Sequence, residues 1–461
     1  MISPTASHNS LQQFDRPKCH PNTRVAVIKK IQDWILGNTD ISPVMWLHGA
    51  AGAGKTAISH TIAAWCEEQN LLLASFFFFR GDRTRKHIKP LIATLAYGIA
   101  LSVPAMRPFV ERAVELDPNI FSRRLEVQLV KLVLEPFECV SRAGASHTLP
   151  HVIVIDGLDE CVDPVEQKAL LWLLTSALGD WMPGWRVLVS SRAELAISNL
   201  FNNAPLMNIS TRIALDSSEY KSGDDIRRFL VDAFDVIKQI HSRRMYIPFD
   251  WPRSDTIDKL VQKSSGQFIY AKTVIKYVES EYHSPCRRLE TLLGIREAPS
   301  DGHDLPFVEL DFLYTHILSS TRVADVETTC RVVALCISYH DINWWGFERT
   351  EELAVPDGLE FIGDIMNKDE EELSLILSEL GSIISLDDDC NWFKVLHASL
   401  ADFLFDPVRS HLYVNRGSLN AQIACHFLQR FADGIYIGEF SLPNNADIVT
   451  QNLRIPICTV S

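Results

Sequence analysis

A glycine-rich segment, residues 49–56, has the residue types and spacing needed to hold a chain of phosphates. It reads GAAGAGKT and fits the pattern G-x-x-x-x-G-K-[ST] in full. Glycines let such a loop fold back so that consecutive backbone N–H groups point at a phosphate, and a following helix adds its positive end. The charge of Lys55 suits the β- and γ-phosphates, and the Thr56 hydroxyl is a ligand for Mg²⁺. We therefore predict that a nucleotide is bound by Gly49, Ala50, Ala51, Gly52, Ala53, Gly54, Lys55 and Thr56.

Carboxylates follow a second apolar run, Val152–Ile155, in the sequence DGLDE of residues 156–160. A parallel strand covered by helices is apolar on both faces, so its first charged residue lies at the C-terminal edge, where open α/β sheets bind ligands. We predict that Asp156 holds Mg²⁺ together with Thr56, and that Asp159 and Glu160 orient or deprotonate an attacking water. A simple helix-capping role stays open for Asp159 and Glu160, because acids favour first helical turns.

An arginine follows a third apolar run, Val187–Val189, after two serines. Arg192 could reach a γ-phosphate and report whether it is present, because a guanidinium pairs strongly with phosphate oxygens. The alternative is an exposed ion pair with Glu194, which would carry little energy.

The elements that must position these residues alternate between strand and helix. A helical pattern at 25–36 precedes the first strand, and another at 55–68 follows the glycine-rich loop. Such alternation predicts an α/β fold, a doubly wound parallel sheet that ends near residue 205. The expected strands are Val44–Leu47, Leu72–Phe78, Val152–Ile155 and Val187–Val189.

Beyond residue 205 the pattern is helical, at 224–240, 255–264 and 268–281, and again at 311–320, 326–339 and 369–380. Runs at 383–386 and 392–396 flank a polar turn and predict a hairpin, so the second group has the outline of a winged helix. We expect a lead and helix at residues 1–40, followed by a P-loop NTPase domain at 41–205 and a helical lid at 206–300. A winged-helix-like domain at 301–415 and a partly helical tail at 416–461 follow the lid in the chain.

In this order, the segments resemble the NACHT-type signal-transduction NTPases of the STAND class, which are NLR-like, in the form abundant in mushroom-forming fungi. The resemblance covers residues 19–413. Besides the glycine-rich loop (Walker A) and DGLDE (Walker B), it rests on residues 17–24, 76–82, 191–194, 251–252, 268–271, 310–314 and 396–404. This chain departs from the family at Ala193, at residues 265–267 and at Leu400.

The resemblance implies roles for further residues. The strand that carries Arg192 would lie between the Walker A and Walker B strands, which makes Arg192 a sensor of the γ-phosphate. His397 would contact the β-phosphate of ADP and lock a closed state, with a packed, satisfied histidine as the alternative. Arg24 would lie near the adenine or ribose, and Arg80 near the γ-phosphate or in an ordinary ion pair.

The phosphate site and the resemblance together imply a cytoplasmic ATP/ADP switch with Mg²⁺ as cofactor. The resemblance further implies slow ATP hydrolysis that controls opening and homo-oligomerisation, in fungal non-self recognition or programmed cell death. A nucleotide-binding scaffold without turnover is the alternative. Family members commonly carry effector and repeat domains, so we expect unknown effector or sensor partners, and the chain is either a reduced switch or an incomplete gene product.

Composition and motifs exclude several other classes. The 461 residues carry a net charge of −14, and the expected hairpin turn holds Asp387, Asp388 and Asp389, which opposes nucleic-acid binding. No apolar run reaches the ~20 residues of a membrane span. A GTPase would need an N-K-x-D motif, which residues 367–370 do not supply, and the scattered cysteines fit no zinc or disulfide pattern.

Overall fold

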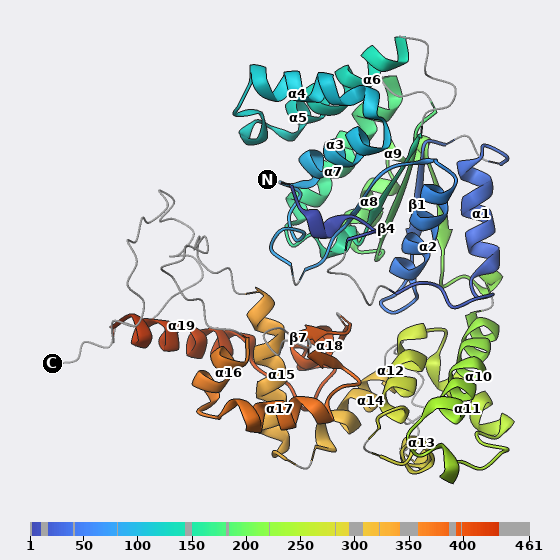
Figure 1. Ribbon diagram of the computed structural model, residues 1–461, viewed down its shortest axis with the longest axis vertical. Coiled ribbons are helices and arrows are strands. Elements are labelled where there is room, and N and C mark those ends of the chain that lie inside the picture. Colours follow the sequence, from blue (N-terminus) through green and yellow to red (C-terminus); the bar gives the residue numbers. More distant parts are fainter. Residues whose placement is uncertain are drawn as a thin grey trace.

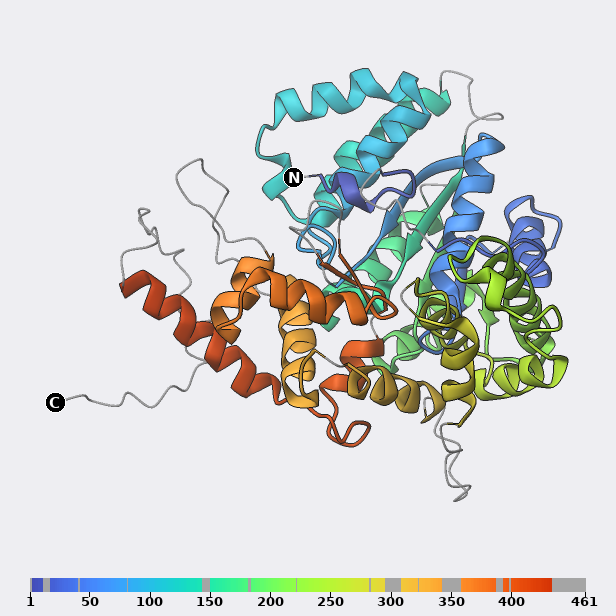
Figure 2. The same ribbon diagram turned by 60° about the horizontal axis from the view of Figure 1, so that its bottom comes forward.

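The computed structural model describes residues 2–10, 17–39, 42–80, 82–142, 150–180, 184–220, 222–281, 283–294, 308–321, 323–341, 358–386, 393–397 and 399–432. Figures 1 and 2 show a sheet with helices on both faces, a group of helices that follows it in the chain, and a second helical group with a small hairpin.

The central sheet has five parallel strands in the order β2-β3-β4-β1-β5. Their bounds are β1 Val44–His48, β2 Leu72–Phe77, β3 Val152–Asp156, β4 Arg186–Ser191 and β5 Ser210–Ala214. The four expected strands are confirmed. β4 lies between β1 and β3, as the resemblance implied, so the ends of the three strands that carry the candidate residues are neighbours.

The strands β1 to β4 each contribute side chains to two cores, because successive side chains point to opposite faces of the sheet. In β1, Val44 and Trp46 join one core and Met45 and Leu47 the other. The first core includes residues of α3, α7 and α8, and the second includes residues of α1 and α2. These helices are α1 Val25–Ile35, α2 Lys55–Glu68, α3 Leu91–Ser102, α7 Pro164–Asp180 and α8 Leu195–Phe201. The doubly wound α/β fold is thereby confirmed.

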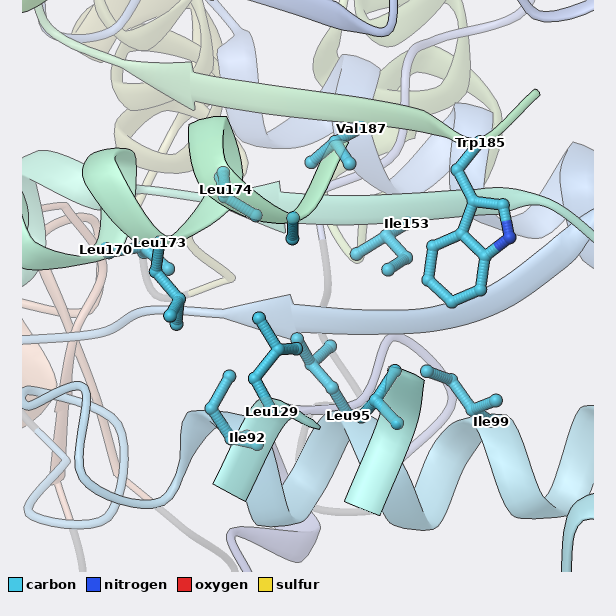
Figure 3. A pocket seen from close by; sticks show the side chains of 12 residues that line it. Ile92, Leu95, Ile99, Leu129, Ile153, Leu170, Leu173, Leu174, Trp185 and Val187 are labelled. Carbon is cyan, nitrogen blue, oxygen red and sulfur yellow. The ribbon is translucent and has the colours of Figure 1, made fainter. Parts of the chain in front are cut away.

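A helical segment connects β2 to β3 and lies at the top of Figure 1. After α3 it comprises η3 Pro104–Met106, α4 Arg107–Leu116, η4 Ile120–Ser122, α5 Leu125–Leu129, η5 Val130–Leu134 and α6 Glu135–Val140. Between it, α7 and the sheet lies a cavity of about 30 Å³, lined by Ile92, Leu95, Leu170 and other apolar side chains (Figure 3). A void of this size and lining suits no nucleotide, so it is a gap in the packing and not a candidate site.

The lid helices are amphipathic, and their apolar sides meet in one core. In α10, the side chains of Ile226, Leu230, Phe234 and Ile237 are buried at helical spacing. The lid elements are η8 Ser218–Tyr220, α10 Ser222–Ile240, η9 Arg244–Tyr246, α11 Ser254–Ser264, α12 Phe268–Val278 and α13 Pro285–Gly294. The three helices expected in this part of the chain are confirmed.

The C-terminal group shares a continuous core with the lid, which runs from Ile226 to Ile423. Its elements are α14 Val308–Ser319, α15 Val326–Asp341, α16 Gly358–Met366, α17 Glu370–Glu379, β6 Ile384–Leu386, β7 Phe393–Val395, α18 Ser399–Leu404 and α19 Arg416–Ala432. β6 and β7 pair antiparallel, so the expected hairpin is confirmed. Its turn, with Asp387, Asp388 and Asp389, lies outside the described residues.

One expectation about the chain is corrected. The strands do not end before residue 205, because β5 follows α9 (Leu206–Ile209) and pairs with β1 at the edge of the sheet. Only Ile213 of this strand is fully buried, so it lacks an apolar run. The polar lead contains a short helix, η1 Pro4–Ala6, whose Ala6 belongs to the core.

Among the described helices, none is by itself long and apolar enough to cross a membrane. α3 and the segment Pro104–Leu116 meet the length and composition test only when they are combined across a bend of 118°.

Candidate functional site

The glycine-rich loop joins the end of β1 to the start of α2, as its chemistry requires. Gly52 and Gly54 have φ angles of +76° and +96°, in the left-handed region where glycine carries little cost. Lys55 Nζ donates to the carbonyl oxygens of Gly49 at 2.8 Å and Ala50 at 2.9 Å, which holds its ammonium group over the loop. Burial lowers the pKa of Lys55, and the charge of Asp159 opposes this shift. The loop thus keeps a desolvated cation where a phosphate would bind.

The first turn of the lid helix α12 rests on this loop. The backbone N–H of Ile269 donates to the carbonyl oxygen of Gly52 at 3.3 Å. A Cβ atom on Gly52 would lie 2.1 Å from Cγ2 of Ile269, so only glycine allows this approach. The lid is therefore in direct contact with the phosphate-binding loop.

We expect Gly52→Ala to push the lid off the loop. The free energy of unfolding of this variant should be about 2 kcal/mol lower than that of Gly37→Ala, because overpacking adds to the backbone strain. Gly37 is the matched control, since its φ is +73° but nothing lies within 4 Å of its Cβ position. Thermal unfolding of both variants measures the difference. Equal stabilities of the two variants would contradict the contact.

Asp156 ends β3 beside the end of β4, and its carboxylate is buried. Ser190 Oγ donates to Asp156 Oδ1, and the Gly157 N–H donates to Ser190 Oγ at 3.2 Å. Burial raises the pKa of Asp156, whereas the hydroxyls of Ser190, Ser59 and Thr56 lower it. A buried carboxylate beside the Thr56 hydroxyl is a donor set that suits Mg²⁺, because a cation would offset the cost of burying the charge. These residues fit the predicted metal site.

Asp159 is held by the backbone and side chain of Arg192. Its Oδ1 accepts from the Arg192 N–H at 2.9 Å, and its Oδ2 lies 3.1 Å from Arg192 Nε. Asp159 and Glu160 belong to a 3-10 helix of three residues, η7 Leu158–Glu160. The carboxylate of Asp159 therefore lies where it can position Arg192, and its predicted role toward an attacking water stays a prediction.

Glu160 lies beside Asp159 and Arg80. Its Oε2 accepts from the Arg80 backbone N–H at 3.1 Å, and Arg80 Nη2 donates to the Asp159 carbonyl oxygen at 3.0 Å. Burial and then the charge of Asp159 raise the pKa of Glu160 to about 7. A carboxylate with this pKa can accept a proton at neutral pH, which suits a general base.

Arg192 comes directly after β4 and bridges two parts of the molecule. Besides Asp159, it binds Asp402 of α18, with 2.8 Å between Nη1 and Oδ2. Among the residues that the structure describes, Arg192 forms ion pairs with Asp159 and Asp402, so the expected alternative of an exposed pair with Glu194 is wrong. Arg192 lies close enough to Lys55 to lower the pKa of that lysine.

His397 follows β7 and lies near Arg192 and Lys55. Burial, and then the charges of Arg192, Lys55 and Lys272, lower its pKa to about 3, so the ring is neutral. The Ser399 N–H donates to Nδ1 at 3.1 Å, and Ser399 Oγ lies 2.7 Å from the same atom. Because Nδ1 accepts, the ring proton is on Nε2. An N–H group of this kind can donate to a phosphate oxygen, and the contact with the β-phosphate that the resemblance implies stays a prediction.

Arg24 is buried beside the loop, with 3% of its surface exposed. Its Nη2 donates to the Ala53 carbonyl oxygen at 2.8 Å, and its guanidinium lies over the Phe268 ring at 5.0 Å. Nε and Nη1 are buried and have no hydrogen-bond partner in the described part of the chain. Buried donors of this kind usually have a partner, so a bound nucleotide would satisfy them. That Arg24 faces the adenine or ribose remains a prediction.

Several residues near the site are not among the predicted ones. Asp216, just after β5, accepts from the Ala50 N–H at 3.0 Å, and Lys272 of α12 lies near His397. Ser190 could have been found in the sequence, because it follows an apolar run as Asp156 does. Asp402 lies 210 residues from Arg192 and carries no local signal.

Residues 25–192 match the family model described as Nephrocystin 3, N-terminal. This span begins at α1 and ends at Arg192, so it includes the loop and the DGLDE segment. No curated protein matches the chain in sequence.

Among solved structures, the chain is similar to a STAND protein with a tetratricopeptide repeat sensor from Pyrococcus horikoshii, at 14% identity and a TM-score of 0.40. The likeness covers 87% of this chain and 45% of that protein, so the chain spans less than half of its length. Cdc6p from Pyrobaculum aerophilum is similar at 12% identity and a TM-score of 0.33, over 90% and 97% of the two chains. The ORC1 protein of Aeropyrum pernix, solved in complex with DNA, is similar at 13% identity and a TM-score of 0.35, and the likeness covers 90% of this chain and 95% of that protein.

The loop after β1, the carboxylates at the end of β3 and the parallel sheet together give this chain the fold of a P-loop NTPase, and its residues 25–192 are similar to the N-terminal region of nephrocystin 3.

Proposed function

We propose that the chain is an ATP/ADP-dependent switch of the STAND class, in which bound nucleotide joins the sheet, the lid and the C-terminal helices. The observation that carries this proposal is the convergence of three parts of the molecule on one loop. Ile269 of the lid contacts Gly52, and His397 of the C-terminal group lies near Lys55. A ligand held at this junction can change the arrangement of all three parts when its phosphate chain is shortened.

Each residue of the site has its own proposed role in binding or cleaving the nucleotide. The loop amides and Lys55 bind the phosphates, and Thr56 and Asp156 hold Mg²⁺, which would neutralise charge on the phosphate oxygens when bound. Glu160 takes the proton of the attacking water, and Asp159 positions Arg192. We expect hydrolysis to be slow, because a switch requires that both of its states persist.

We further propose the biological setting that the NACHT resemblance implies. ADP would hold a closed monomer, ATP would open it, and the open form would assemble into homo-oligomers in the cytoplasm. Its task would be non-self recognition or programmed cell death in a fungus, with effector and sensor proteins as partners.

The proposal is tested by calorimetry with Mg·ADP and by single-turnover cleavage of ATP. Binding with cleavage supports a switch, and binding without cleavage supports a nucleotide-binding scaffold. Absence of binding to the folded protein would overturn both functions.

His397→Ala should weaken Mg·ADP binding about tenfold or more, because a hydrogen bond to a charged group contributes about 1.5–3 kcal/mol. Loss of this contact should also raise the oligomeric fraction in ATP. Calorimetry and light scattering measure the two effects. His411→Ala, an exposed histidine of the same part of the chain, is the control. A variant that binds ADP normally and stays monomeric in ATP would remove His397 from the clamp.

A further inference from the structure

Asp402 is placed where it competes for the arginine that would bind a γ-phosphate. Its Oδ2 lies 2.8 Å from Arg192 Nη1, and the two side chains are 27% and 25% exposed. Within the described part of the chain, Arg192 is the one cation with which Asp402 forms an ion pair. The neighbouring Arg409 is committed to Asp311, with 3.0 Å between Nε and Oδ2.

The contacts of Arg192 with Asp159 can stay in place while the partner of its Nη1 atom changes. Asp159 accepts from its backbone N–H and lies 3.1 Å from its Nε, and these contacts do not involve the C-terminal helices. Nη1 is the atom that points to Asp402. A guanidinium pairs with carboxylate and phosphate oxygens through the same donors, so a phosphate oxygen could replace Oδ2 of Asp402.

If a phosphate replaces Asp402 as the partner of Arg192 Nη1, Asp402 is left near other carboxylates. Glu194 and Asp159 lie close by, and burial followed by the charges of Asp159 and Asp402 raises the pKa of Glu194. Like charges repel, so an unpaired Asp402 is driven away from the end of β4. Asp402 lies on α18, which begins two residues after His397, so its departure would also withdraw the histidine.

We infer that Asp402 acts as an internal mimic of the γ-phosphate and sets the preference of the site for ADP over ATP. The inference rests on the proposed function and deepens it. With ADP the carboxylate keeps Arg192 and holds α18 against the sheet. ATP must displace that carboxylate, and its displacement leaves α18 unpaired.

The test compares the affinities of Mg·ATPγS and Mg·ADP by calorimetry on the full chain. Asp402→Asn should tighten Mg·ATPγS about fivefold, because the competing charge is gone, and change Mg·ADP by less than about twofold. Asp406→Asn, four residues further along and just after the end of α18, is the matched control and should alter neither affinity. In an Arg192→Ala background, Asp402→Asn should have no effect, since the competition acts through the arginine.

Three outcomes overturn the inference while leaving the proposed function intact: an unchanged ratio of the two affinities, equal tightening of both nucleotides, or a persistent effect in the Arg192→Ala background. If the wild-type protein binds neither nucleotide, the proposed function itself fails. Circular dichroism of each variant confirms that the affinities are compared between folded proteins.

Discussion

Replacing Lys55 by alanine is expected to weaken Mg·ADP binding about a hundredfold or more. Lys55 is the cation held over the phosphate loop, with Nζ at 2.8 Å and 2.9 Å from two loop carbonyls. Because its ammonium group is buried and partly desolvated, binding phosphate needs little further dehydration. Charge-assisted hydrogen bonds of this kind contribute about 1.5–3 kcal/mol, and loss of a full positive charge adds to that.

The same variant changes how ADP affects stability. Mg·ADP at about a hundred times its Kd should stabilise the wild-type fold by about 2.7 kcal/mol, and at the same concentration the hundredfold weaker binding should leave only about 0.4 kcal/mol in Lys55→Ala. Thermal unfolding with and without nucleotide measures it. Lys29→Ala, which removes an exposed ion pair with Asp33, is the control and should keep the full response. An equal response of Lys55→Ala and wild type would place the nucleotide elsewhere.

The sequence predicts the phosphate site because the necessary information is local. The spacing of residues 49–56, with an apolar strand before it and a helix after it, determines the loop. The carboxylate Asp156 is equally local, because it is the first charged residue after a buried strand. Two neighbouring strand ends must then meet, since carboxyl ends of parallel strands share one edge.

Elements that lack an apolar run cannot be predicted from the sequence in this way. β5 buries only Ile213 fully, because it lies at the edge of the sheet. α16 begins at Gly358 and contains Gly363, and glycine predicts a helix poorly. Gly358 is required there because its Cβ position lies 2.5 Å from the ring of Phe393. Both elements are determined by tertiary packing and not by local preference.

The contacts that join the three parts of the molecule are likewise absent from the local pattern. Arg192 follows an apolar strand and can be singled out in the sequence, but Asp402 lies 210 residues away and nothing in its sequence surroundings marks it as the partner. Their pairing follows from the position of α18 on the common core with the lid, which long-range packing sets. A resemblance could assign Arg192 a role, but only the structure shows its partner.

Glu160→Gln should reduce the single-turnover rate of ATP cleavage about a hundredfold or more, the usual contribution of a general base. The reason lies in its surroundings. Burial and the neighbouring charge of Asp159 raise the pKa of Glu160 to about 7, so it is half ionised near neutrality. In the wild-type protein, cleavage should therefore rise between pH 6 and pH 8 with a midpoint near 7. The variant should lose this dependence together with the rate.

Stability gives a second and opposite readout of the same carboxyl group. Its folded pKa lies above the ordinary value of 4.5, so the folded state retains a proton that the unfolded chain loses. The contribution of Glu160 to stability is therefore present below pH 4.5 and is lost as the pH rises through 7. Glutamine stays neutral, so Glu160→Gln should be more stable than wild type at pH 8, as urea unfolding would measure.

A matched control separates the base from its neighbours. Glu194 lies in the same group of carboxylates, and its pKa is also raised by burial and by Asp159, but it is outside the proposed machinery. Glu194→Gln should keep cleavage within about threefold of wild type, because it takes no proton from water. Undiminished cleavage by Glu160→Gln would exclude Glu160 as the base. If cleavage is absent from wild type as well, with nucleotide bound, the site is a scaffold and the raised pKa is a result of burial alone.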